Sequence, residues 1–423
     1  MDYQVMPLIY AANEYFKNTT RFTIEFNDPI DKDALRYAID KVQIRYPYFS
    51  VRLEKEGEEY VLRENSEPFM LSEGNAAICL NSPESNHHLV AFAYKDDLMS
   101  IDCSHFIADG AGVLPMFQTL AYYYIEKRYG SSDLDPSAFR LVDDEINREE
   151  YENPFPDNVM EGAAEEKYEV DKSNSYQVSD EYFGKREAYF YNLKIRQDEL
   201  MAYAKANGGS PVSALGTVMY RAAMDLLDIG DKNILYQIPH NFRKALGKPL
   251  SHESLATVVF ARLTPEDRNK TDEEINQLLR SQISKGANVP ADLQSINGLI
   301  QLNGYLKTMP LAAKIQTMQG VVGSTMSTNT FAISYTGNFP WNGLDKYISN
   351  VYAYAGEMER ENGIGLEVFV IGDYFSITMM QAGKNSLMVD GIIKAFADRG
   401  VTCALVREGT YRLCDYKLPE ADQ

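Results

Sequence analysis

Cysteine and histidine are scarce in this sequence, and their placement predicts no metal centre. The 423 residues include four cysteines and five histidines. Cys79, Cys103, Cys403 and Cys414 are scattered and form no C-x-x-C pair, which excludes the usual zinc and redox motifs. No histidine has metal-ligand spacing with another. We therefore expect no metal cofactor, and we expect the cysteines to be buried free thiols in a reducing compartment.

Long apolar runs are also missing. No uninterrupted apolar stretch approaches the roughly 20 residues that span a bilayer, so no membrane span is expected. The first residues, MDYQVMPLIYAANEYF, lack the basic region and the continuous apolar segment of a signal peptide. We interpret the protein as soluble and cytoplasmic.

Basic residues are outnumbered by acidic ones. The chain has 41 Lys and Arg against 61 Asp and Glu, which gives a net charge of −20 at pH 7. Such a surface repels nucleic acids and anionic lipid headgroups, so neither is expected as a partner. Hydrophobic residues make up 45% and aromatic residues 12%, which is typical of a globular protein. The length suffices for two or more domains.

Strand and helix patterns alternate through residues 1–140, which are predicted to form one domain. Strands are expected at 20–27, 49–56, 58–64, 89–95 and 98–104, and helices at 31–45 and 113–128. Asp31 is predicted to cap the first helix, which Pro47 ends. Residues 141–180 are acidic and without a clear period, which indicates a linker or surface excursion.

Residues 181–423 are predicted to form a second domain. Strands are expected at 187–195, 234–243, 258–263 and 330–337, in a hairpin within 364–381 and in a terminal hairpin around Glu408-Gly409. Helices are expected at 197–206, 211–227, 271–286, 291–307 and 388–399. This alternation, with its many hairpins, favours an α/β fold of α+β layers with mixed sheets.

The stretch 101–112, IDCSHFIADGAG, carries the strongest chemical signal. His105 follows a strand pattern, Asp109 comes four residues later, and Gly110 allows a sharp turn and the close approach of a ligand or a second domain. An oriented neutral imidazole can remove a proton from a hydroxyl or an amine. Asp109 could orient the ring directly or pair with an arginine elsewhere. His105 as a core histidine and Asp109 as a simple helix cap are the alternatives.

The stretch SHFIADG resembles the HxxxDG signature of the CoA-dependent acyltransferase superfamily, whose fold resembles that of chloramphenicol acetyltransferase. Condensation domains of peptide synthetases and alcohol acetyltransferase-like proteins are members. Many members have two consecutive histidines, and here Ser104 takes the first position. Further similar stretches follow in the family's order, at 200–224, 238–248 and 333–339, and 45–53 also fits.

The resemblance implies two similar domains, each a mixed sheet with helices, and an active-site tunnel between them. His105 would lie midway along that tunnel as the catalytic base. Asp109 would turn away from the substrate and pair with Arg243, as structural support of the site. His240 and His252 lie near Arg243 in the sequence and are weaker candidates for lining a channel.

Donor and oxyanion contacts are predicted from the same resemblance. Lys244 and Lys248 are candidates for binding coenzyme A, with scattered solubilising lysines as the alternative. Ser334, Thr336 and Asn338 are candidates for the oxyanion and the pocket. Related enzymes often have Ser-Asn-x-Gly here, whereas this chain has Ser-Tyr-Thr-Gly.

The expected activity is transfer of an acyl group, acetyl in the first instance, from acyl-CoA to the hydroxyl or amine of a small molecule. His105 would act as general base, acyl-CoA as cosubstrate, and no covalent acyl-enzyme would form. One alternative is a condensation-type enzyme whose donor is the thioester of a separate acyl or peptidyl carrier protein. The other is a binding protein that keeps the fold without catalysis.

Overall fold

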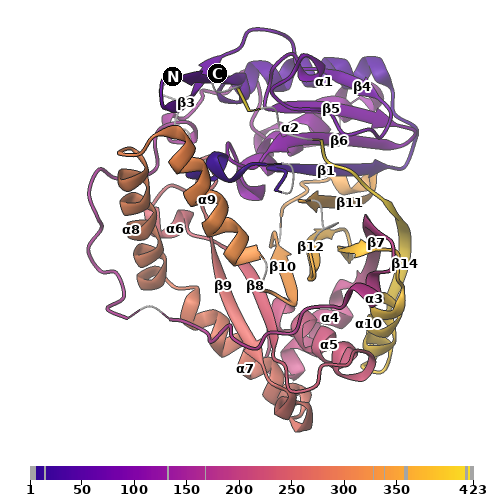
Figure 1. Cartoon of the computed structure of the whole chain (residues 1–423). Coiled ribbons are helices and arrows are strands. Elements are labelled where there is room, and N and C mark those ends of the chain that lie inside the picture. Colours follow the sequence, from indigo (N-terminus) through magenta and orange to yellow (C-terminus); the bar gives the residue numbers. More distant parts are fainter. Residues whose placement is uncertain are drawn as a thin grey trace.

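The computed structural model describes residues 6–13, 16–130, 133–166, 168–326, 328–337, 339–356, 361–414 and 418–419. Two large sheets dominate it, each with helices packed against it (Figure 1). The mixed α/β layers predicted from the sequence are thereby confirmed. Of the described helices, none is long and apolar enough to cross a membrane.

The first sheet has five strands, and most of them come from the beginning of the chain. Its order is β11-β1-β6-β5-β4, with β1 at Thr19–Phe26, β4 at Leu71–Glu73, β5 at Val90–Lys95, β6 at Leu98–Ser104 and β11 at Ile348–Ala355. Two helices and a separate hairpin accompany it: α1 at Lys32–Arg45, α2 at Gly110–Tyr129, β2 at Val51–Glu56 and β3 at Glu59–Glu64. Phe22 of β1 packs on Phe117 of α2, with ring centroids 6.1 Å apart.

The second sheet has seven strands in the order β14-β7-β13-β12-β10-β8-β9. These are β7 at Arg186–Arg196, β8 at Ile234–Asn241, β9 at Ala256–Leu263, β10 at Phe331–Tyr335, β12 at Ile364–Ile371, β13 at Tyr374–Gly383 and β14 at Cys403–Thr410. The helices from this part of the chain are α3 at Asp180–Phe183, α4 at Gln197–Ala206, α5 at Pro211–Leu226, α6 at Arg243–Leu246, α7 at Asp272–Gly286, α8 at Val289–Leu306, α9 at Leu311–Met326 and α10 at Leu387–Ala397. Of these, α9 packs against residues 7–11 and the core of the first half. Ser210 caps α5, as its sequence predicts.

Short 3-10 helices complete the described elements. They lie at Pro7–Ala11, Pro47–Phe49, Pro83–Ser85, Pro136–Ala138, Arg148–Glu150, Pro265–Asn269 and Leu344–Lys346. The fifth of them lies in the acidic stretch between α2 and β7, which otherwise has little regular structure.

Strand β11 ties the two halves of the chain together. It comes from the second half yet pairs antiparallel with β1, with Phe22 opposite Ala353. The orange strand at the level of the first sheet in Figure 1 is this crossover. The first sheet is therefore completed by a strand more than 200 residues beyond the predicted limit at 140, and the limits 140 and 180 stay a prediction.

Several elements differ from their prediction. Helix α2 begins at Gly110, earlier than the expected 113, and α9 and β11 were not expected at all. The predicted terminal hairpin around Glu408-Gly409 is wrong. Strand β14 runs straight through both residues, with Glu408 opposite Tyr191 of β7, because the edge of β7 offers a ladder of hydrogen-bond partners that a turn would forgo.

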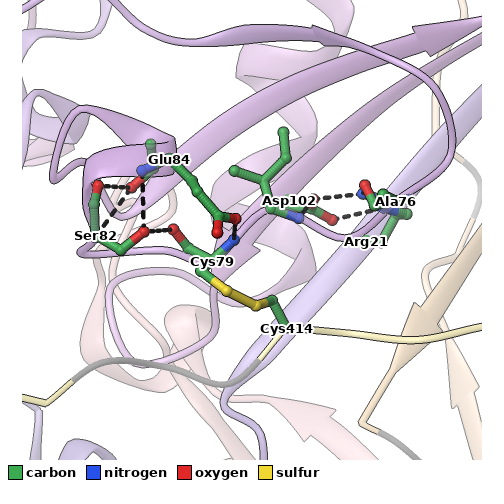
Figure 2. Close-up of a disulfide and its surroundings, with 9 residues drawn as sticks. Arg21, Ala76, Cys79, Ser82, Glu84, Asp102 and Cys414 are labelled. Atoms are coloured by element: carbon green, nitrogen blue, oxygen red, sulfur yellow. Dashed lines mark hydrogen bonds and ion pairs between the residues drawn. A yellow bond between two sulfur atoms is a disulfide. The ribbon is translucent and has the colours of Figure 1, made fainter.

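The prediction of four free thiols is also wrong. Figure 2 shows a disulfide between Cys79 and Cys414, which are 335 positions apart in the sequence. The loop that carries Cys79 is held from the other side by buried Arg21, which donates to the carbonyl oxygen of Ala76 (Figure 2). Cys103 is a buried free thiol, as expected, and Cys403 is free and half-buried. Spacing rules concern neighbouring cysteines, so they give no information on a pair this far apart.

Candidate functional site

His105 lies directly after β6, at the edge where the first sheet ends. Its backbone N–H donates to the carbonyl oxygen of Asn18, over 2.9 Å. The same carbonyl accepts a bond of 3.3 Å from the hydroxyl of buried Ser104, the residue in place of a first histidine. The imidazole is half-buried, and its Nδ1 lies 3.4 Å from the hydroxyl oxygen of Ser254. Hydrogen bonds thus hold the backbone of His105 and one nitrogen of its ring.

Asp109 caps α2 and forms an ion pair at the same time. Its Oδ1 accepts the backbone N–H of Gly112 over 2.9 Å, which is the helix cap. Both carboxylate oxygens also accept from Arg243, over 2.7 Å from Nη2 and 2.9 Å from Nη1. Among its described contacts, none goes to the ring of His105. Asp109 therefore both caps the helix and pairs with a distant arginine, which the sequence had offered as alternatives. Its carboxylate does not orient the imidazole directly.

The guanidinium of Arg243 is buried and fully used. Besides the aspartate, it donates to the carbonyl oxygens of Ser251 and Glu253 and to the side-chain oxygen of Asn241. A planar guanidinium matches a carboxylate with two parallel bonds, which makes this a bidentate pair. The pair therefore fixes a loop of the first half against a segment of the second.

Of that segment, residues 251–255, only His252 was a candidate from the sequence. The backbone N–H of Leu255 donates to Asp109 over 2.9 Å, and the backbone N–H of His252 donates to the carbonyl oxygen of Glu150. The available signal was a short polar stretch, SHES, between two strand patterns near Arg243. It carries no motif, so only the fold shows that it borders His105.

The close approach of the two halves occurs at Gly112 and not at the predicted Gly110. A Cβ atom on Gly112 would lie 1.9 Å from the carbonyl oxygen of His252, so only glycine fits. A Cβ atom on Gly110 would meet nothing within 4 Å. The space beside Gly110 is therefore unfilled, and the expected contact of Gly110 with a ligand stays a prediction.

Two ionisable groups of this segment are displaced from their ordinary state by burial. Burial raises the pKa of Glu253 to about 8, with the charges of Arg243 and Asp109 acting in opposite directions. Burial lowers the pKa of His252 to about 4, so that imidazole is neutral. His252 packs on Tyr48, with ring centroids 4.6 Å apart, and is buried, and its lining of a channel stays a prediction.

Glu150 anchors the acidic excursion to this core. Its carboxylate accepts from Arg45 and from the hydroxyl of Tyr48, and Arg140 lies 3.3 Å away. Burial alone would raise the pKa of Glu150, but the bonds from Arg45 and Tyr48 and the nearby arginines outweigh it and lower that pKa. At Glu150 the excursion is therefore packed against the core and is not merely a charged surface in contact with solvent.

Comparison with known proteins identifies the fold. No protein-family model matches the sequence, and no curated protein sequence matches it. Solved structures match with high coverage. TRI101 of F. graminearum, in complex with coenzyme A and T-2 mycotoxin, superposes with a TM-score of 0.61 at 10% identity, over 95% of this chain and 99% of that chain.

Two further structures agree. Polyketide synthase associated protein 5 of Mycobacterium tuberculosis gives a TM-score of 0.57 at 15% identity, over 90% of this chain and 93% of its own. The epimerization domain from the third module of tyrocidine synthetase B gives 0.59 at 11% identity, over 94% of this chain and 95% of its own. The chain has the CoA-acyltransferase-like fold. The fold expected from SHFIADG is thereby confirmed.

Within this acyltransferase-like fold, the oxyanion candidates lie on and after β10. Ser334 lies opposite Glu367 of β12 in the parallel register. Burial raises the pKa of Glu367 to about 7, and a hydrogen bond with Ser334 lowers it. The hydroxyl of Thr336 donates to the carbonyl oxygen of Val368 over 2.9 Å. Asn338 lies outside the described residues. In the described part, Ser334 and Thr336 have no hydrogen bond to His105.

The candidate donor-binding lysines differ in their surroundings. Lys244 is exposed at the start of α6. Lys248 pairs with Glu152, so a phosphate would have to replace that carboxylate. His240 is half-buried and lies 3.2 Å from a carboxylate oxygen of Asp292 on α8. Lys244 therefore keeps the freer charge of the two lysines.

Proposed function

We propose that this protein is an acyltransferase that moves an acyl group from acyl-CoA to the hydroxyl or amine of a small molecule, with His105 as general base. The observation that carries the proposal is the placement of His105. Its ring is half-buried, one nitrogen is next to Ser254, and its loop is pinned by the bidentate Asp109–Arg243 pair. A general base requires one nitrogen that is held and one that is free, and in the described part of the chain Nε2 of His105 has no hydrogen bond.

The proposed reaction has one proton transfer each way. Nε2 of His105 takes the proton of the acceptor as its oxygen or nitrogen attacks the thioester carbon. The carbon–sulfur bond of the tetrahedral intermediate then breaks, and the imidazolium returns the proton to the sulfur, which leaves free CoA thiol. No covalent acyl-enzyme forms. Ser334 and Thr336 are the proposed oxyanion donors, and their hydroxyls would have to leave Glu367 and the carbonyl oxygen of Val368 to serve as such.

The donor and the setting are inferred from several observations. TRI101 is bound to coenzyme A in a structure of the same fold, which supports acyl-CoA as cosubstrate, and its T-2 mycotoxin supports a small-molecule acceptor. We place the coenzyme near Lys244 and the reaction in a tunnel between the domains 1–140 and 181–423. We place the protein in the cytoplasm.

The decisive experiment measures thiol release from acetyl-CoA and longer acyl-CoAs with a panel of alcohols and amines. We expect turnover by the wild type and a loss of at least about 100-fold in His105→Ala, since general-base catalysis contributes about 10²–10⁴-fold. Lys232→Ala, at an exposed position, controls for handling. Equal turnover by wild type and His105→Ala would contradict the mechanism.

A condensation-type reaction is the second candidate. It is favoured by the likeness to an epimerization domain and to the first condensation domain of the calcium-dependent antibiotic synthetase. It requires a separate carrier protein as donor. Turnover with an acyl-phosphopantetheine carrier protein but not with acyl-CoA would select it. No turnover with either donor would favour a binding protein without catalysis.

A further inference from the structure

The hydroxyl of Ser254 is the side-chain group that the described structure places on the ring of His105. Its oxygen lies 3.4 Å from Nδ1. Ser254 comes from the far half of the chain, 149 positions from the histidine. Such bonds are often long in the absence of substrate and shorten in the reacting complex.

The direction of this bond decides whether His105 can be a base. A neutral imidazole carries its proton on one nitrogen, and the partner of that nitrogen determines which one. If Nδ1–H donates to the serine oxygen, the lone pair of Nε2 is free to take a proton. If the hydroxyl donates to Nδ1 instead, Nε2 carries the proton and cannot act as the base.

The backbone on both sides of Ser254 is fixed by the buried ion pair. On one side, Arg243 donates to the carbonyl oxygen of Glu253. On the other side, the N–H of Leu255 donates to Asp109 over 2.9 Å. The ion pair therefore holds both peptide units that flank the serine, and it acts on the imidazole through that serine although Asp109 does not touch the ring.

We propose that Ser254 is a positioning residue that keeps His105 in the tautomer with Nδ1 protonated and Nε2 free. The role of Ser254 in catalysis rests on the proposed acyltransferase function, whereas its effect on the tautomer of His105 does not require a substrate. After Nε2 takes the proton of the acceptor, the same Nδ1–H···Oγ bond stabilises the imidazolium until the proton passes to the leaving sulfur.

The first test is the pair of variants Ser254→Ala and Ser254→Thr. We expect Ser254→Ala to lower kcat for thiol release about 10- to 100-fold, with KM for acyl-CoA within about 2-fold of wild type, because the base and not the donor site is disturbed. Ser254→Thr keeps the hydroxyl and is expected to restore most of kcat. An unchanged kcat in Ser254→Ala would overturn the proposal, as would equal losses in both variants.

The second test reads the ring without any substrate. The full chain is labelled with ¹⁵N-histidine, and the spectrum of His105→Gln assigns the ring nitrogens of His105 by their absence. With the ring neutral, we expect the wild type to show a protonated Nδ1 and a bare Nε2. In Ser254→Ala the two shifts are expected to move toward a mixture of tautomers.

Ser251→Ala is the matched control for the spectra. Ser251 lies in the same segment, and its hydroxyl oxygen is bonded to the backbone N–H of Glu253 and not to the ring. We expect the His105 shifts of this variant to equal those of the wild type. Identical shifts in Ser254→Ala and wild type would overturn the proposal. The spectra are recorded without substrate, so they test the role of Ser254 independently of activity. A wild type that releases no thiol would contradict the proposed function but would not change what the spectra say about Ser254.

Discussion

At the scale of single residues, Glu253 shows how burial without a partner sets the charge of a side chain. It is 4% exposed, and its Oε2 has no hydrogen-bond partner in the described part of the chain. A carboxylate in such a place loses its hydration without compensation, so the acid keeps its proton. Burial accordingly raises the pKa of Glu253 to about 8. Near neutral pH the side chain next to Ser254 is therefore mostly an uncharged acid.

This environment predicts a pH-dependent cost to stability. The pKa of Glu253 is about 8 when folded and near the ordinary 4.5 when unfolded. Between these values the unfolded chain releases a proton that the folded chain retains, so the free energy of unfolding falls as the pH rises. Glu253→Gln keeps the shape and cannot titrate. We expect its free energy of unfolding to exceed that of the wild type by about 4 kcal/mol at pH 8 and to match it at pH 4.

Denaturant unfolding at pH 4, 6 and 8 measures this difference. Glu152→Gln is the control, since Glu152 lies at the surface with Lys248 and should show no such rise between pH 4 and 8. A difference between Glu253→Gln and wild type that is the same at all three pH values would contradict the assignment.

At the scale of elements, Asp109 joins the N-terminus of α2 to the segment before β9. It supplies the cap to Gly112, the ion pair to Arg243 and a bond to Leu255. Asp109→Ala removes all three and leaves a buried cation unpaired, which costs about 3–5 kcal/mol. We expect that loss in the free energy of unfolding, together with a loss of thiol release because the segment holding Ser254 is released.

Asp109→Asn separates the cap from the ion pair. Asparagine is as good a cap as aspartate, so this variant keeps α2 but loses the charge that balances Arg243. We expect it to unfold more easily than the wild type and less easily than Asp109→Ala, as measured by denaturant titration. A free energy of unfolding unchanged in Asp109→Ala would show that the buried pair does not stabilise the fold.

How much of this could be read from the sequence depends on how local each signal is. Helix α1 was predicted with its cap, and Asp31 accepts the N–H of Ala34 as expected. Helix α9 was missed because Gly320 and Gly323 lie within it and favour a loop. Strand β11 was missed because β1, its partner, lies more than 300 positions away.

The site divides in the same way. The ion pair of Asp109 and Arg243 followed from a resemblance, since SHFIADG and IPHNFRKALGK are recognisable stretches. Ser254 and the requirement for Gly112 did not follow, because both depend on one backbone segment lying against another. No local pattern of residue types records that contact, and it becomes visible only once the two halves are assembled.

At the scale of the whole molecule, the C-terminal tail spans both sheets. After β14, the ring of Tyr411 stacks on that of Tyr354 of β11, with centroids 4.6 Å apart, and Leu413 is only 2% exposed. These side chains belong to a small apolar cluster that also includes residues of β6, β7 and β13. The next residue, Cys414, is bonded to Cys79 beside the first sheet. The disulfide therefore links the C-terminal tail to the loop that carries Cys79.

The disulfide should stabilise the protein through its unfolded state. A cross-link between positions 335 apart removes much chain entropy from that state, worth about 6 kcal/mol in a simple polymer model. We expect Cys79→Ser to lower the melting temperature of the oxidised protein, and a reductant to lower that of the wild type equally. Cys403→Ser is the control and should keep the full sensitivity to reductant, because Cys403 is free. Thiol counting in denaturant should find two free thiols before reduction and four after it. Four free thiols before reduction would contradict the disulfide, and the reductant should then leave the melting temperature unchanged.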